Sequence, residues 1–210
     1  MSNFQIPSFT EEKILQAQGY RYIAGIDEVG RGALAGPVAS AAVILPSRIR
    51  ASWTSLVRDS KQLTPGGREI LFHHIRKIAV AVGIGIADCE VVDARGIVVA
   101  TRLSMKMAVQ QLSPAPEFLL IDYLHLPEIN LPQKGITFGD SLCFSIACAS
   151  IIAKVTRDRL MVELDEVHQG YGMARHKGYG TRQHLDCLLR LGPSPAHRRS
   201  FKPVREMIET

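Results

Sequence analysis

The sequence predicts an α/β domain built around a mixed β-sheet. Two strand-like apolar runs come first, and helical and strand-like segments then alternate along the chain, an order that favours a sheet covered by helices. The composition agrees, since 46% hydrophobic and 21% charged residues are ordinary values for a globular chain of 210 residues. We therefore expect a central sheet of about five strands flanked by helices, with a helical appendage at the C-terminus.

Strand signals occur in short apolar runs, each of which stops at Gly, Pro or Asp. These runs are residues 22–26, 38–45, 80–87, 118–121 and 135–138. The glycine-rich turn Gly30-Arg31-Gly32 lies between the first two runs, which predicts that they form a hairpin.

Helices are expected where apolar residues recur at helical spacing or where a capping residue opens a run. They span residues 11–19, 65 to about 78, 93 to about 112 with Asp93 as N-cap, 145 to about 168, and 182 to 191 with Thr181 as N-cap. Thr64 before a proline is a further N-cap signal. Ala147, Ala149 and Ala153 are small, so the fourth helix can lie close to the sheet.

The net charge of +5 is concentrated at the C-terminal end of the chain. Residues 171–210 hold eight Lys or Arg against three Asp or Glu, while residues 1–170 are balanced. We therefore divide the chain into a catalytic domain, 1–170, and a basic helical segment, 171–210, that contributes to substrate binding. A basic segment on a neutral body can attract phosphates, although a charged terminal face is also often plain solvated surface.

The sequence indicates a cytoplasmic protein without a membrane partner. No apolar run reaches the roughly 18 residues that span a bilayer. Residues 1–10 lack the basic and apolar regions of a signal peptide. The four cysteines form no C-x-x-C pair, so we expect free thiols and neither a zinc site nor a disulfide framework.

Acidic residues recur at the ends of the predicted strands. Asp27 and Glu28 follow the first strand, Asp122 follows the fourth, and Asp140 opens the fourth helix. Ligands of open α/β sheets gather beyond the carboxyl ends of strands, and carboxylates brought together there repel one another unless cations neutralise them. Two Mg²⁺ or Mn²⁺ ions about 4 Å apart would suit such oxygen ligands and promote an in-line phosphodiester displacement. Taken singly, each acid could instead be a surface residue, and Asp140 could be a plain N-cap.

Four groups of motifs follow one another along the chain. They are GIDEVGRG at 25–32 with LAGPV at 34–38; DSKQL at 59–63; GD at 139–140 with SIA at 145–147 and ASIIAKVTRD at 149–158; and HKGYGT at 176–181 with GPSP at 192–195 and HRRSF at 197–201. In this order they resemble the ribonuclease HII family, the type 2 RNases H, over residues 22–204. The resemblance implies an RNase H-like fold and an endonuclease that cuts RNA–DNA hybrids.

The resemblance also implies a four-carboxylate site that binds two divalent metal ions, Mg²⁺ or Mn²⁺, during catalysis. The residues that match the family pattern are Asp27, Glu28, Asp122 and Asp140, and Asp27 is the best candidate to bridge both ions. The implied reaction is hydrolysis on the 5′ side of a ribonucleotide, including one embedded in duplex DNA, that leaves a 5′-phosphate and a 3′-hydroxyl.

Substrate-binding residues follow from the same resemblance. The backbone of Gly30, Arg31 and Gly32 and the side chain of Tyr179 are expected to read the ribonucleotide, since glycines allow the close approach that recognition of a 2′-hydroxyl needs. Two lysines, Lys61 and Lys154, are expected to hold backbone phosphates. An anchoring role for Tyr179 and an ordinary helix-surface role for Lys154 are the alternatives.

The chain departs from the family pattern at two positions beside the acids. Phe138 replaces a common lysine, and Tyr123 replaces a common glycine, which puts local phosphate contacts and loop shape in doubt. Two other functions are considered: the sister ribonuclease HIII, which typically has an added N-terminal domain, and a non-catalytic duplex-binding module. We expect a monomer that binds RNA–DNA hybrids and ribonucleotide-containing DNA.

Overall fold

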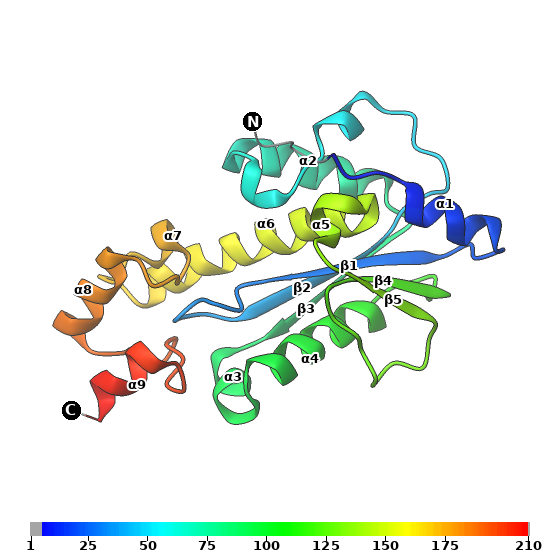
Figure 1. The fold of residues 1–210 in the computed structure, drawn as a ribbon. Helices are drawn as coiled ribbons and strands as arrows, with labels where there is room; N and C mark the ends of the chain where they lie inside the picture. The colour runs from blue at the N-terminus through cyan, green and yellow to red at the C-terminus, as the bar shows by residue number, and fades with distance from the viewer. Residues whose placement is uncertain (1–5, 210) are drawn as a thin grey trace.

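The computed structural model describes residues 6–209 and has a five-stranded mixed sheet at its centre (Figure 1). The strands are β1 (Ile23–Val29), β2 (Val38–Ile44), β3 (Ala81–Ala87), β4 (Phe118–Asp122) and β5 (Gln133–Ile136), in the spatial order β3-β2-β1-β4-β5. Strands β1, β2 and β3 pair antiparallel, whereas β4 and β5 add in parallel beside β1. The predicted mixed sheet and its opening hairpin are therefore confirmed. The first five residues of the segment considered for a signal peptide lie outside the described residues.

Helices cover both faces of this sheet. They are α1 (Thr10–Ala17), α2 (Pro65–Ile78), α3 (Cys89–Arg95), α4 (Ile97–Gln110), α5 (Gly139–Leu142), α6 (Phe144–Val167), α7 (Met173–His176), α8 (Arg182–Leu191) and α9 (Lys202–Ile208), with 3₁₀ turns η1 (Ser52–Leu56) and η2 (Ser60–Gln62). In Figure 1, α6 and α2 lie above the sheet, α4 lies below it, and α7 to α9 form one end of the molecule. Between residues 6 and 209, no helix is both long enough and apolar enough to cross a bilayer.

The long helix α6 lies directly on β1, the strand that carries the first two acids. A Cβ atom at Gly25 would come within 2.2 Å of the carbonyl carbon of Ser145, so only glycine allows this approach. Ala147, Ala149 and Ala153 are all fully buried, as their small size predicted. The close contact fixes β1 firmly against α6, because neither element can shift without opening the core.

The prediction that a helix begins at Asp93 is wrong. Asp88 caps α3 with its side chain, and Gly96, at φ 78°, separates α3 from α4. Asp93 lies inside α3, where its carboxylate accepts hydrogen bonds from the backbone N–H groups of Arg199 and Ser200, each at 2.9 Å. An acid that looks like a local cap is therefore a long-range anchor for the C-terminal segment.

Residues beyond 170 have an apolar cluster that they share with the rest of the chain. Tyr171, Met173 and Leu188 pack there with Leu34 and Met161. Helix α8 begins after its predicted cap at Thr181, while α7 and α9 were not predicted because they are too short to show helical periodicity. The shared cluster holds the basic segment against the turn that follows β1.

Candidate active site

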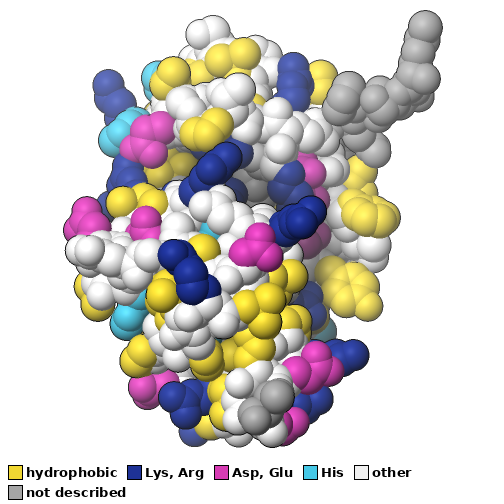
Figure 2. Space-filling view, turned by 90° about the vertical axis from the view of Figure 1, so that its left-hand side faces the viewer, with side chains coloured by type: hydrophobic (Ala, Val, Ile, Leu, Met, Phe, Trp, Pro, Cys, Tyr) yellow, Lys and Arg dark blue, Asp and Glu magenta, His cyan; other side chains and the backbone are white. Residues whose placement is uncertain are grey.

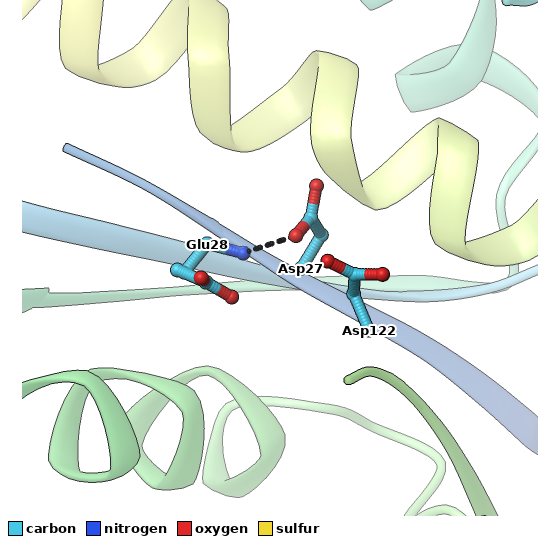
Figure 3. A group of neighbouring side chains, drawn as sticks. All are labelled: Asp27, Glu28 and Asp122. Atoms are coloured by element: carbon cyan, nitrogen blue, oxygen red, sulfur yellow. Dashed lines mark hydrogen bonds between the residues drawn. The ribbon is translucent and has the colours of Figure 1, made fainter. Parts of the chain in front are cut away.

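Three carboxylates meet where β1 and β4 lie side by side. The register of these parallel strands pairs Ile26 with Ile121, which places Asp27 next to Asp122. Ligand oxygens of Asp27, Glu28 and Asp122 all lie within 4.8 Å of one another. Figure 3 shows Asp27 between the other two, with its carboxylate turned toward α6 and that of Glu28 turned to the opposite side of the strand.

The first two acids belong to β1 itself rather than to the loop after it. Strand β1 continues to Val29 because it stays paired with β2 as far as Ala39. The backbone of Asp27 and Glu28 is therefore fixed by the sheet, and the N–H of Glu28 also donates to Oδ1 of Asp27 at 2.7 Å. Rigid placement of this kind favours a preorganised ligand set.

Burial raises the free energy needed to ionise these three carboxyl groups. It raises the pKa of Asp27 well above the ordinary value, and the carboxylates of Glu28 and Asp122 raise it further. Burial also raises the pKa of Glu28, against the opposing charge of Arg31, whose Nη1 lies 3.3 Å from Oε1. The pKa of Asp122 is raised by burial too, although the Gly139 N–H donates to its Oδ1 at 2.7 Å. A cation would relieve all of these costs at once.

The donor set fits a hard divalent cation. All the ligand atoms are carboxylate oxygens, which Mg²⁺ and Mn²⁺ prefer, whereas zinc favours nitrogen and sulfur. Oε2 of Glu28 is buried and accepts no hydrogen bond from any described residue. A buried carboxylate oxygen without a donor is costly, and coordination of a metal ion would satisfy it.

Asp140 lies near this group but outside it. The residue is buried at the start of α5, and its Oδ2 is 3.3 Å from Nζ of Lys61. Burial would lower the pKa of Lys61, but the carboxylates of Asp140 and Asp59 outweigh it, so that the pKa is raised. Arg68 supports this loop because its Nη1 donates to the carbonyl oxygen of Ser60 at 2.9 Å.

A single hollow of about 550 Å³ holds every predicted site residue except Asp140. The glycine turn and Tyr179, which are far apart in sequence, both line it together with the three carboxylates. Lys61 and Lys154 lie at the same hollow, but each already faces an acid, since Nζ of Lys154 is 2.7 Å from Oδ1 of Asp158. The structure therefore gathers the predicted residues around one space.

Two buried arginines that sequence reasoning missed shape this hollow. Arg157 is fully buried on α6 and donates to the carbonyl oxygens of Ala35, Pro37 and Lys177. Its guanidinium carbon lies 5.5 Å from the centre of the Tyr179 ring, so it holds the β1–β2 connection and the Tyr179 segment together.

The glycine turn also depends on Arg157. A Cβ at Gly30 would come within 2.1 Å of the Nε atom of Arg157, and Gly30 has a φ of +95°. The second buried arginine, Arg198, donates to the carbonyl oxygens of Arg31 and Gly36. The position of each arginine inside a motif could have indicated a special role. The carbonyl groups that accept its hydrogen bonds, however, belong to distant segments that no local sequence pattern identifies.

A chain of histidines lies behind Tyr179 and was also missed. The Ser194 N–H donates to Nδ1 of His197 at 3.0 Å, so the neutral His197 ring carries its proton on Nε2. That proton is donated to Nε2 of His184 at 2.9 Å, and Nδ1 of His184 then donates to the carbonyl oxygen of Tyr179 at 3.0 Å. Every ring nitrogen of this pair is used only if both rings are neutral.

Solved structures share this fold. The PCNA:RNase HII complex from Archaeoglobus fulgidus matches with a TM-score of 0.73 and 28% identity, over 86% of this chain and 95% of the other. Bst-RNase HIII in complex with Mn²⁺ matches with a TM-score of 0.66 and 19% identity, over 90% of this chain and 70% of the other. The fold and the acidic site thus define the ribonuclease H class of nucleases.

The chain belongs to the ribonuclease HII family. The family model of that description matches residues 24–204. A curated relative, a ribonuclease HII from Dehalococcoides mccartyi, is 57% identical over 203 residues, which cover 97% of this chain and 96% of the relative. The predicted resemblance and the RNase H-like fold are confirmed, and the protein is a nuclease rather than a non-catalytic module.

Proposed function

We propose that this chain is an endonuclease that hydrolyses the RNA strand of RNA–DNA hybrids. In duplex DNA that contains a ribonucleotide, the enzyme cleaves the phosphodiester bond on the 5′ side of that ribonucleotide. The products carry a 5′-phosphate and a 3′-hydroxyl. The observation that carries the proposal is the convergence of Asp27, Glu28 and Asp122 in the same hollow as the glycine turn and Tyr179. Carboxylates account for phosphodiester hydrolysis, and the turn and the tyrosine account for the choice of sugar.

Asp27, Glu28 and Asp122, with Asp140 beside them, would hold two divalent cations, Mg²⁺ or Mn²⁺. When bound, such ions lower the pKa of water and offset the charge on the attacking and leaving oxygens of the phosphodiester. Asp27 lies between the other two carboxylates (Figure 3), and we expect it to serve both ions. Its place in the β1 ladder keeps that position fixed.

The chain's own groups would select the substrate. Backbone groups of Gly30, Arg31 and Gly32 can approach a ribose closely enough to exchange hydrogen bonds with its 2′-hydroxyl. The Tyr179 ring would pack against the next sugar and favour one that lacks the hydroxyl. Lys61, Lys154 and the basic segment 171–210 would contact backbone phosphates, and we expect the enzyme to work as a cytoplasmic monomer.

The test is a labelled DNA duplex with one embedded ribonucleotide, incubated with Mg²⁺ or Mn²⁺. Wild type should cut on the 5′ side of the ribonucleotide, Asp27→Asn should not, and Tyr179→Ala should cut much more slowly. Tyr179→Phe is the matched control, because it keeps the ring and removes only the hydroxyl. If the ring packs against the sugar, this variant retains most of the activity.

Each alternative has its own outcome in this assay. Cleavage of long RNA–DNA hybrids without cleavage at the single ribonucleotide would favour a ribonuclease HIII-like specificity and contradict the proposed recognition of the ribonucleotide. Failure to cleave either substrate with either metal would overturn the proposed reaction.

A further inference from the structure

A second hollow adjoins the carboxylate hollow. It has a volume of about 540 Å³ and is lined by residues of α2, α6 and α7; we refer to it as the α2–α7 groove. Arg68 and Lys154 line both hollows, so the groove leads away from the carboxylates. Figure 2, which faces the end of the molecule with α7 to α9, shows Lys and Arg side chains around a recess above these helices.

Cations outnumber acids in the α2–α7 groove. Two carboxylates, those of Glu69 and Asp158, face five cationic side chains: Arg68, Lys154, Arg159, Arg175 and Lys177. The cations come from three different helices or their ends, and no single point collects them. Such a distribution suits a polyanion with charges at intervals better than it suits one small anion.

Ion pairs within the groove leave much of this charge uncompensated. Asp158 accepts from Nζ of Lys154 at 2.7 Å and lies 3.8 Å from Arg68, and its backbone carbonyl accepts from Lys177 at 3.2 Å. The carboxylate of Asp158 therefore serves two cations, and the third, Lys177, donates only to a backbone carbonyl oxygen. Arg159 pairs with Glu69, whereas the side chain of Arg175 is exposed and has no hydrogen bond or ion pair with any residue from 6 to 209.

The environment of Lys177 agrees with an excess of positive charge. Burial lowers the pKa of Lys177, and the charges of Lys154 and Arg157 lower it as well, against the opposing carboxylate of Asp158. A bound anion would favour the charged form of this lysine and would also provide a partner for Arg175.

We propose that the α2–α7 groove binds the sugar–phosphate backbone of the substrate duplex outside the scissile position, at two or more phosphates. The inference rests on the proposed function, which supplies a nucleic acid in the adjoining hollow. Binding of the nucleic-acid backbone in the groove would add affinity for long duplexes. It would not depend on base sequence, because every nucleotide carries the same phosphate.

The salt dependence of binding tests this proposal. Binding of a labelled RNA–DNA hybrid about two helical turns long is measured in EDTA at several KCl concentrations, so that no cleavage occurs. The groove variant is Arg159→Gln with Arg175→Gln, two exposed residues outside the carboxylate hollow. The matched control is Arg48→Gln with Arg50→Gln, which removes the same charge from an exposed site beside α1.

The slope of log K against log salt should become shallower by roughly 0.9 for each phosphate that the variant no longer neutralises. We expect a flatter slope for the groove variant and the wild-type slope for the control. Equal slopes for wild type and the groove variant, or the same decrease in the control, would overturn the proposal. Binding is measured without catalysis. An enzyme that cleaves neither substrate would therefore refute the proposed function, whereas the salt dependence of binding could still be interpreted.

Discussion

Acidification should destabilise the fold through His197. This ring is buried and faces the His184 ring on α8 and the Tyr171 ring, and His176 on α7 stacks on His184. Burial, reinforced by the charge that His184 would carry, lowers the pKa of His197 from 6.5 to about 4. A proton on Nδ1 would also oppose the Ser194 N–H, which already donates to that atom.

The sign and size of the effect follow from these pKa values. Because the folded protein binds this proton more weakly than the unfolded chain, the stability is complete above pH 6.5 and is lost as the pH falls toward 4. Each pH unit in this window removes about 1.4 kcal/mol, so the complete loss is about 3 kcal/mol. Burial lowers the pKa of His184 as well, which adds to the loss.

Urea unfolding of wild type and His197→Gln, in EDTA from pH 7 to pH 4, measures this loss. Glutamine can still donate to His184 but does not titrate. The buried carboxylates titrate in the opposite direction, and comparison of the two proteins cancels their contribution. The advantage of wild type should shrink by about 3 kcal/mol across the range. A constant difference would refute the reasoning, and His125→Gln, at an exposed loop position, should behave as wild type.

Three further results are expected from the site and its supports. Mg²⁺ at about 100 times its Kd should stabilise wild type by about 2.7 kcal/mol, whereas Asp27→Asn should melt higher than wild type without metal and respond little to Mg²⁺; an equal Mg²⁺ shift in both proteins would contradict the ligand role. Gly30→Ala should cost about 1–3 kcal/mol in urea unfolding, because its methyl group meets Arg157, and an unchanged midpoint would show that the turn can yield. Phe138→Asn should raise the stability by about 1 kcal/mol in thermal unfolding, since asparagine tolerates the left-handed φ of 58° better; a lower melting temperature would mean that the exposed ring makes contacts worth more than the strain.

The predictable part of this fold is the part with local signals. Apolar runs located the strands, and the position of Asp27 and Asp122 near strand ends predicted that the acids would meet. The start of α3 was missed because Asp88 and Asp93 are both plausible caps, and only the contact of Asp93 with residues 199–200 separates them.

The supports of the site could not be predicted from the sequence. Arg157 reads as one more polar position on a helix, yet it is fully buried, and its acceptors are carbonyl groups that every residue carries. The pairing of His184 with His197 joins two residues outside any common periodicity. The sequence thus identifies groups that need a particular side chain for chemistry, whereas contacts to backbone atoms depend on the completed fold.

The hydrogen bonds made by Arg198 affect the order in which parts of the site can form during translation. Its guanidinium holds the carbonyl oxygens of Arg31 and Gly36, more than 160 residues earlier in the chain. In a growing polypeptide all four acids therefore precede the group that secures the glycine turn, Asp27 by 171 residues and Asp140 by 58. A chain interrupted between residues 140 and 198 therefore has the four carboxylates but lacks a support of the glycine turn.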